Sequence, residues 1–88
     1  MTFTPPVPVA AAVARADCLI HKASPLEVCA TRWPRACRGD VNRRRRVAVI
    51  TCKIEGVAWR ATRSSTGRWL YTAMPAAVTV FADGSAIG

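Results

Sequence analysis

Acidic residues and histidine are scarce in this chain of 88 residues. It has five Asp and Glu side chains and one histidine, and the carboxylates are scattered rather than paired. General acid-base catalysis needs such groups within reach of one another, and the sequence also has no phosphate-binding glycine loop and no nucleophile elbow. We therefore expect a protein that binds a partner rather than an enzyme.

Long apolar runs are also missing. No stretch approaches the roughly 20 apolar residues that a membrane-spanning helix needs. The first eight residues carry no positive side chain and contain three prolines, which is unlike a secretory signal peptide. We expect no membrane partner and a cytoplasmic location, and in that compartment the four cysteines are expected to be free thiols.

Positive charge is what the sequence has in excess. Thirteen Lys and Arg residues give a formal net charge of +8, and eleven of the thirteen are arginine. The planar guanidinium forms paired hydrogen bonds with phosphate or carboxylate and stacks on flat rings. An anionic partner is therefore expected, although a GC-rich genome and a need for solubility would give the same composition.

The N-terminal half predicts helices. Residues 1–8 are rich in proline and are expected to be a flexible or extended tail, followed by one small domain over residues 9–88. Residues 9–23 are rich in alanine, and their larger side chains recur at spacings of three or four, which predicts a helix. A capping box at Ser24–Glu27 predicts a second short helix that ends near Trp33, before a proline.

The C-terminal half changes to the pattern of strands. Residues 34–42 contain arginine, glycine and aspartate and are expected to be a loop. Segments rich in β-branched and aromatic residues predict strands at 47–54, 57–63, 68–73 and 77–82. The predicted fold class is α+β, with one or two short N-terminal helices followed by a three- to four-stranded antiparallel β-meander. The unpaired edge of such a meander would permit a homodimer.

The connection around Ser64–Gly67 predicts the register of one strand pair. A three-residue loop with Gly67 in the left-handed region pairs Ser64 with Arg68. We expect the aromatic face of this hairpin to be the core, with Arg60 and Arg68 as cross-strand neighbours on the exposed face. The alternative is that its rings stack on nucleic-acid bases. The residues of this aromatic face are Trp59, Ala61, Arg63, Trp69, Tyr71 and Ala73.

The spacing of the cysteines is a weak match to a metal site. Cys18 and His21 are separated by two residues, as in many zinc sites, but Cys29 and Cys37 are too far apart for the usual second pair of ligands. Together with Cys52 these residues would supply the ligands of the alternative zinc site. We expect no metal and no other cofactor, with Cys29 and Cys52 buried as small apolar side chains.

The run Arg43–Arg46 is the strongest candidate for a binding site. Its four consecutive charges would neutralise several phosphates, and if a strand opens at Val47, alternate arginines of the run point to opposite sides of the sheet. The alternative is a solvated loop that protects a sheet edge from aggregation. The residues expected to bind nucleic acid or a protein partner are Arg35, Arg38, Arg43, Arg44, Arg45, Arg46, Arg60, Arg63 and Arg68.

Two functions fit this pattern. The first is binding of nucleic acid, or of an acidic or nucleic-acid-containing complex, through an arginine-rich face. The second is protein binding, because small basic chains are common among accessory proteins of phages and mobile elements. Such a chain would act in the cytoplasm of a bacterial host and inhibit a host defence complex, as anti-CRISPR proteins do. No motif in the sequence identifies a family.

Overall fold

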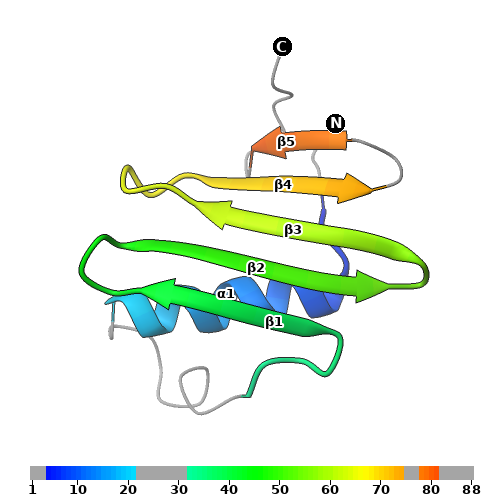
Figure 1. Cartoon of the computed structure of the whole chain (residues 1–88), viewed down its shortest axis with the longest axis horizontal. Helices are drawn as coiled ribbons and strands as arrows, with labels where there is room; N and C mark the ends of the chain where they lie inside the picture. The colour runs from blue at the N-terminus through cyan, green and yellow to red at the C-terminus, as the bar shows by residue number, and fades with distance from the viewer. Residues whose placement is uncertain (1–3, 22–31, 75–77, 82–88) are drawn as a thin grey trace.

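The computed structural model describes residues 4–21, 32–74 and 78–81. These residues form one helix and five strands, and each strand pairs antiparallel with the next strand along the chain (Figure 1). The predicted α+β class with a β-meander is confirmed, with one strand more than expected. The elements are α1 (Val7–His21), β1 (Cys37–Asn42), β2 (Val47–Ile54), β3 (Val57–Arg63), β4 (Trp69–Met74) and β5 (Val78–Phe81).

Helix α1 begins at Val7, two residues earlier than predicted. Proline was expected to delay the helix, but Pro8 lies in the first turn, where its missing amide has no intrahelical acceptor to lose. The second predicted helix, residues 24–33, lies mostly outside the described residues, and its last two residues are not helical. Within the described residues, no helix is long and apolar enough to span a bilayer.

The core lies between α1 and one face of the sheet, which we call the inner face. Figure 1 shows α1 crossing behind β1 and β2, and it also contacts β3. Val9, Ala12 and Ala16 of the helix are fully buried, and they pack with Ile50 at the centre of β2. The inner face is the sheet's buried side, made by Cys37, Ala48, Ile50, Cys52, Ala61, Arg63, Trp69, Tyr71 and Ala73, together with the half-buried Trp59.

The other side of the sheet, which we call the outer face, carries charged, polar and apolar side chains. Its residues alternate with those of the inner face along each strand, as in β2, where every second side chain is exposed. Strand register places these residues in rows that cross the sheet. The outer face comprises Arg38, Asp40, Asn42, Val47, Val49, Thr51, Lys53, Ala58, Arg60, Thr62, Leu70, Thr72 and Met74.

Strand β1 was expected to be a loop. Its residues include arginine, glycine, aspartate and asparagine, which have low strand propensity. The strand nevertheless pairs with β2 along its whole length, and the ring of Trp33 packs directly over Gly39. Long-range pairing and packing therefore override local propensity in this segment.

The β3–β4 hairpin has the predicted register. The Ser64 amide donates to the Arg68 carbonyl oxygen (3.1 Å), and Gly67 has a φ of 86°, as the three-residue loop requires. Trp69 and Tyr71 are each 6% exposed. The aromatic face is therefore the core, as expected, and these two rings are not available to stack on bases.

A disulfide joins Cys37 of β1 to Cys52 of β2. The two residues lie directly opposite each other with their Cα atoms 4.0 Å apart. The Lys53 amide donates to the Ala36 carbonyl oxygen next to them, which makes Cys37 and Cys52 a non-hydrogen-bonded pair, the kind whose side chains approach closely. Cys18 is also disulfide-bonded, so the described residues include no free cysteine. The expectation of free thiols was wrong because it came from the assumed compartment, whereas the pairing depends on a strand that the sequence did not reveal.

Candidate functional site

The predicted arginine run forms the turn between β1 and β2. Arg43–Arg46 follow the last β1–β2 pair, Asn42 with Val47, and all four are exposed. The amide of Arg45 donates to Oδ1 of Asn42 (3.0 Å), and Arg46 adopts a left-handed φ of 56°. The run is a closed turn, so the expected alternation of its arginines between the two sheet faces is wrong. Its four charges project from one end of the sheet.

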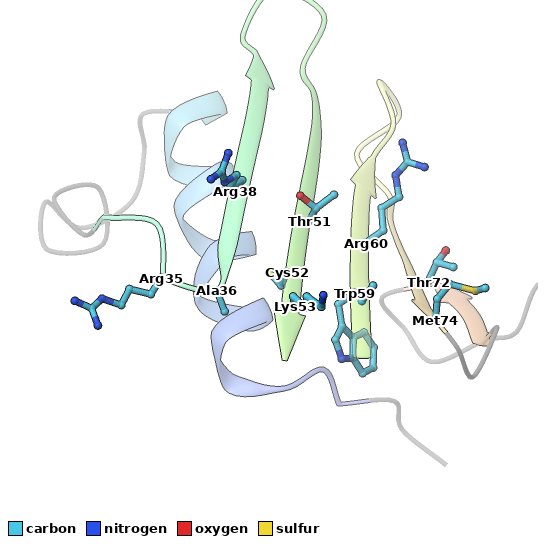
Figure 2. Close-up of a pocket in the computed structure, with 11 residues that line it drawn as sticks. Arg35, Ala36, Arg38, Thr51, Cys52, Lys53, Trp59, Arg60, Thr72 and Met74 are labelled. Carbon is cyan, nitrogen blue, oxygen red and sulfur yellow. The ribbon is translucent and has the colours of Figure 1, made fainter. Parts of the chain in front are cut away.

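A second group of cations lies in a row across the outer face. Arg38 of β1 is opposite Thr51 of β2, and Thr51 is in turn opposite Arg60 of β3. Because neighbouring strands are about 4.8 Å apart, the backbones of the two arginines are about 10 Å apart. Lys53, two residues beyond Thr51, is exposed on the same face. Figure 2 shows Arg38, Thr51 and Arg60 on three adjacent strands.

These side chains border a groove with a volume of about 520 Å³ (Figure 2). Thr51 lies between Arg38 and Arg60, Thr72 lies beyond Arg60, and no acidic side chain of the described residues lines the groove. Part of the lining is apolar, since Met74 is 51% exposed. We call this hollow the basic groove, and the residues that give it its chemistry are Arg35, Arg38, Lys53, Arg60 and Met74.

A smaller hollow lies next to the β1–β2 turn and differs in charge. It has a volume of about 230 Å³ and is lined by Arg45 together with Asp40. The Asp40 carboxylate lies on the outer face between this turn and the row that contains Arg38. Because a carboxylate repels phosphate, this hollow is a poorer anion site than the basic groove.

Arg63 does not belong to the exposed surface. Its side chain is 8% exposed, with Nε 3.3 Å from Oδ1 of Asp17. Nη1 donates to the carbonyl oxygen of Arg46 (2.6 Å), and Nη2 lies 3.0 Å from Nε2 of His21. Since a guanidinium only donates, His21 accepts through Nε2. Arg63 thus ties α1 to the β1–β2 turn, and we remove it from the expected binding residues.

Asp17 connects this buried cluster to the aromatic core. Its carboxylate accepts hydrogen bonds from Nε1 of Trp69 at 3.1 and 3.3 Å. Burial raises the pKa of Tyr71 above its usual value, and the negative charge of Asp17 raises it further. The inner face therefore contains a polar cluster that serves packing.

Arg68 is exposed next to the β3–β4 turn, at the same end of the sheet as Arg43–Arg46. It lies opposite Ser64, whereas Arg60 pairs with Thr72. The expected contact between Arg60 and Arg68 across the strands is wrong, because the three-residue loop places them four positions apart in register.

Sequence reasoning missed the contributions of Lys53 and Thr51 to the groove. Alternation along residues 47–54 places both on one face, which was a usable signal. Their neighbour Arg38 could not be placed, because its strand was expected to be a loop. Trp59, considered as a core ring or a stacking ring, is half-buried and packs against the core from the inner face.

The ligand set of the alternative zinc site is not assembled in the described part of the chain. Cys18, Cys37 and Cys52 are disulfide-bonded, which removes their thiolates, and Cys29 lies outside the described residues. Among the described residues, no three His, Cys, Asp or Glu side chains are grouped to hold a metal ion.

The described surface therefore offers two groups of exposed cations, one in the β1–β2 turn and one around the basic groove. No family model matches the chain, and no curated protein or solved structure is detectably similar to it. Its function has to be inferred from the chemistry of its own described surface, which is rich in exposed cations.

Proposed function

We propose that the protein binds nucleic acid through the outer face of its sheet and the β1–β2 turn. The observation that supports this proposal best is the basic groove, which Arg35, Arg38, Lys53 and Arg60 border and which no carboxylate of the described residues lines. Guanidinium and ammonium groups in this arrangement suit phosphates, which dominate the affinity of proteins for nucleic acids.

The positions of the two cation groups fit a chain of phosphates. They lie at opposite ends of β2, since the turn precedes Val47 and Lys53 is near the other end. At about 3.3 Å per residue, six residues separate the groups by about 20 Å. A nucleic-acid strand laid along β2 would contact both groups, and the net charge of +8 would attract it from a distance.

A binding titration tests this proposal. We expect fluorescent 20-nucleotide DNA or RNA to bind with a Kd below about 1 µM near physiological salt, tighter than generic charge contacts usually give. If four phosphates of a single strand are neutralised, the plot of log K against log salt concentration has a slope of about −3. Absence of binding at 50 mM salt would contradict the proposal.

A charge-reversal variant tests the role of the turn. Arg44→Glu with Arg45→Glu should weaken binding at least tenfold without changing the melting temperature, because both side chains are exposed. The matched control is Arg44→Lys with Arg45→Lys, which keeps the charge and should bind within a fewfold of the wild type. Full binding by the glutamate variant would exclude the turn from the interface.

The alternative is that the partner is an acidic protein or a nucleoprotein, as it would be for an inhibitor of a host defence complex. This alternative would remain if no oligonucleotide bound in the titration. A pull-down from a bacterial host would then be the next measurement. Tryptophan anchors in a partner pocket would make such binding depend on a few side chains and little on salt.

Two finer predictions from the sequence remain open to test. Cytoplasmic location is one of them, and the Cys37–Cys52 disulfide argues against it, because disulfides persist mainly in oxidising compartments. Trapping of thiols in intact cells tests it: modified cysteines support a cytoplasmic location, and protected cysteines contradict it.

The other finer prediction is a homodimer through a sheet edge. The edges of the described sheet are β1 and β5, and sedimentation at micromolar concentration would detect the dimer.

A further inference from the structure

We infer that the smaller hollow beside the β1–β2 turn selects an unpaired guanine, and that Asp40 is the residue that recognises this base. The inference rests on the proposed function and adds to it which base the surface prefers. Among the described residues of the outer face, Asp40 is the only acidic one. Phosphate binding alone gives no task to a carboxylate at this place, because it repels phosphate.

Asp40 lies between the two groups of cations. Strand pairing places it opposite Val49, in a row that crosses the sheet. This row is two residues, or about 7 Å, from the row of Arg38 and Arg60, on the side toward the turn Arg43–Arg46. A nucleic-acid strand laid along β2 would therefore pass over Asp40 between the places where its phosphates are held. A base, rather than a phosphate, is the part of the strand that suits this position.

The size of the smaller hollow fits a single base. Its volume of about 230 Å³ is below the usual range for small-molecule sites, about 300 to 1,000 Å³, so a whole nucleotide would not be enclosed. Val49 is 36% exposed and offers an apolar contact to the face of a base. The polar side chains that line the hollow are those of Asp40, Asn42 and Arg45.

The carboxylate of Asp40 determines which base is preferred. A carboxylate only accepts hydrogen bonds, and its two oxygens suit two parallel donors. On its Watson–Crick edge guanine has two donors side by side, N1–H and the N2 amino group, whereas adenine, cytosine and thymine each have one donor group there. Because base pairing covers this edge, the contact requires an unpaired guanine, as in a single strand or a loop.

The other polar side chains of the hollow complement the O6 acceptor of guanine. Oδ1 of Asn42 accepts a hydrogen bond from the Arg45 amide (3.0 Å), so the Asn42 side chain has its NH₂ group left to donate. The guanidinium of Arg45 also lines the hollow, and it only donates. The hollow thus combines one acceptor side chain with two donor side chains, which matches the two donors and one acceptor of the guanine edge.

Asp40→Asn and Glu55→Gln are a matched pair of variants. Each removes one carboxylate from an exposed side chain and raises the net charge by one, so general electrostatic attraction is the same in both. Glu55 lies in the turn between β2 and β3 and lines neither hollow. Asp40→Asn keeps the size of the side chain but replaces one acceptor oxygen with a donor. The pair therefore separates base recognition from charge.

The probes are fluorescent 12-nucleotide thymidine strands whose two central bases are guanine, adenine, cytosine or thymine. We expect the wild type to bind the guanine strand at least fivefold more tightly than each of the others, since a paired contact with one base gives discrimination of this size. Asp40→Asn should reduce the preference to less than twofold. It should also bind the all-thymidine strand more tightly, because a charge that repels phosphate is lost. Glu55→Gln should keep the full preference.

Inosine tests the contact at the level of single atoms. Its base keeps the O6 and N1–H of guanine but lacks the N2 amino group, so replacing both guanines with inosine should remove most of the wild-type preference. Pairing should do the same, because blunt duplexes with and without the central G·C pairs both cover the Watson–Crick edge. Full preference for the inosine strand or for the G·C duplex would overturn the contact with Asp40.

The outcomes separate the two proposals. If no oligonucleotide binds, the proposed function itself fails. If the four strands bind equally, or Asp40→Asn keeps the preference for guanine, nucleic-acid binding stands and the selection of the base is overturned. Guanosine monophosphate should compete only at millimolar concentration, because it brings one phosphate. Competition at micromolar concentration would overturn the inference, since the ligand would then be a free nucleotide.

Discussion

Arg60 and Arg63 are three residues apart on β3, yet the two faces of the sheet use them differently. Arg60 is exposed on the outer face and borders the basic groove. Arg63 points to the inner face, where it contacts Asp17, His21 and the carbonyl oxygen of Arg46. An odd spacing on a strand is enough to reverse the side of the sheet. The comparison teaches that arginine content alone does not measure a binding surface.

The first way to break this comparison is at the inner-face disulfide. Replacing Cys37 and Cys52 with serine should lower the free energy of unfolding by about 3 kcal/mol, the value expected for a loop of about 15 residues. The disulfide lies on the inner face, but its removal also frees β1 from its covalent link to β2. Strand β1 carries Arg38 of the groove. Urea denaturation with and without a reductant measures the loss of stability. Equal stability of the oxidised wild type and the variant would show that β1 does not depend on the cross-link.

Arg63→Met sharpens the comparison directly. It should destabilise the protein by about 2 kcal/mol, because Asp17, His21 and the Arg46 carbonyl oxygen lose the buried guanidinium that they contact. The loss is limited because the side chain of Asp17 is 39% exposed and remains partly solvated. The matched variant Arg60→Met should change stability by less than about 0.5 kcal/mol. Chemical denaturation of the two variants provides the measurement. Equal losses in both would contradict the distinction between the faces.

Gly39→Ala tests the packing that holds the unexpected strand. A methyl group at Gly39 would overlap the ring of Trp33, so the ring or the strand has to move. We expect a loss of about 1 to 2 kcal/mol from overpacking. Thermal melting of Gly39→Ala checks this, with Trp33→Leu combined with it as a control that removes the clash. A fully stable single variant would mean that the ring moves without cost.

The smallest stability effect concerns Tyr71 at high pH. Burial and Asp17 raise the pKa of Tyr71 in the folded protein, so above about pH 10 the unfolded chain loses this proton before the folded one does. Stability from this group is therefore complete below about pH 10 and falls as the pH rises further. Tyr71→Phe should flatten this decline, as measured by urea denaturation from pH 8 to 11.5. Parallel declines in both proteins would contradict the assignment.

Much of the second half of the fold was predictable. Alternating β-branched and aromatic residues identified β2 and β3, and the glycine-containing loop after Arg63 fixed the register of the β3–β4 hairpin. These signals are local, because a strand face and a turn type depend on neighbouring residues. The same register correctly assigned Trp69 and Tyr71 to the core.

The groove could not be assembled from the sequence, because it depends on β1. The residues of this strand lack strand propensity, and its partner lies across a turn of four arginines that was not predicted to be a hairpin. Without β1, Arg38 could not be placed next to Thr51, and Cys37 could not be placed opposite Cys52. The role of Arg63 was equally hidden, since its partners Asp17 and His21 are on a distant helix.

The most direct test of the account compares nucleic-acid binding by Arg60→Gln and Arg63→Met, both measured at a temperature at which each is folded. The account predicts that Arg60→Gln weakens binding of a single-stranded 12-nucleotide DNA about fivefold or more, with a shallower salt dependence, because one phosphate contact is lost. Arg63→Met should bind within about twofold of the wild type, because its guanidinium is buried in the fold. Unchanged binding by Arg60→Gln, or a greater loss in Arg63→Met, would contradict the claim that the outer face is the binding surface.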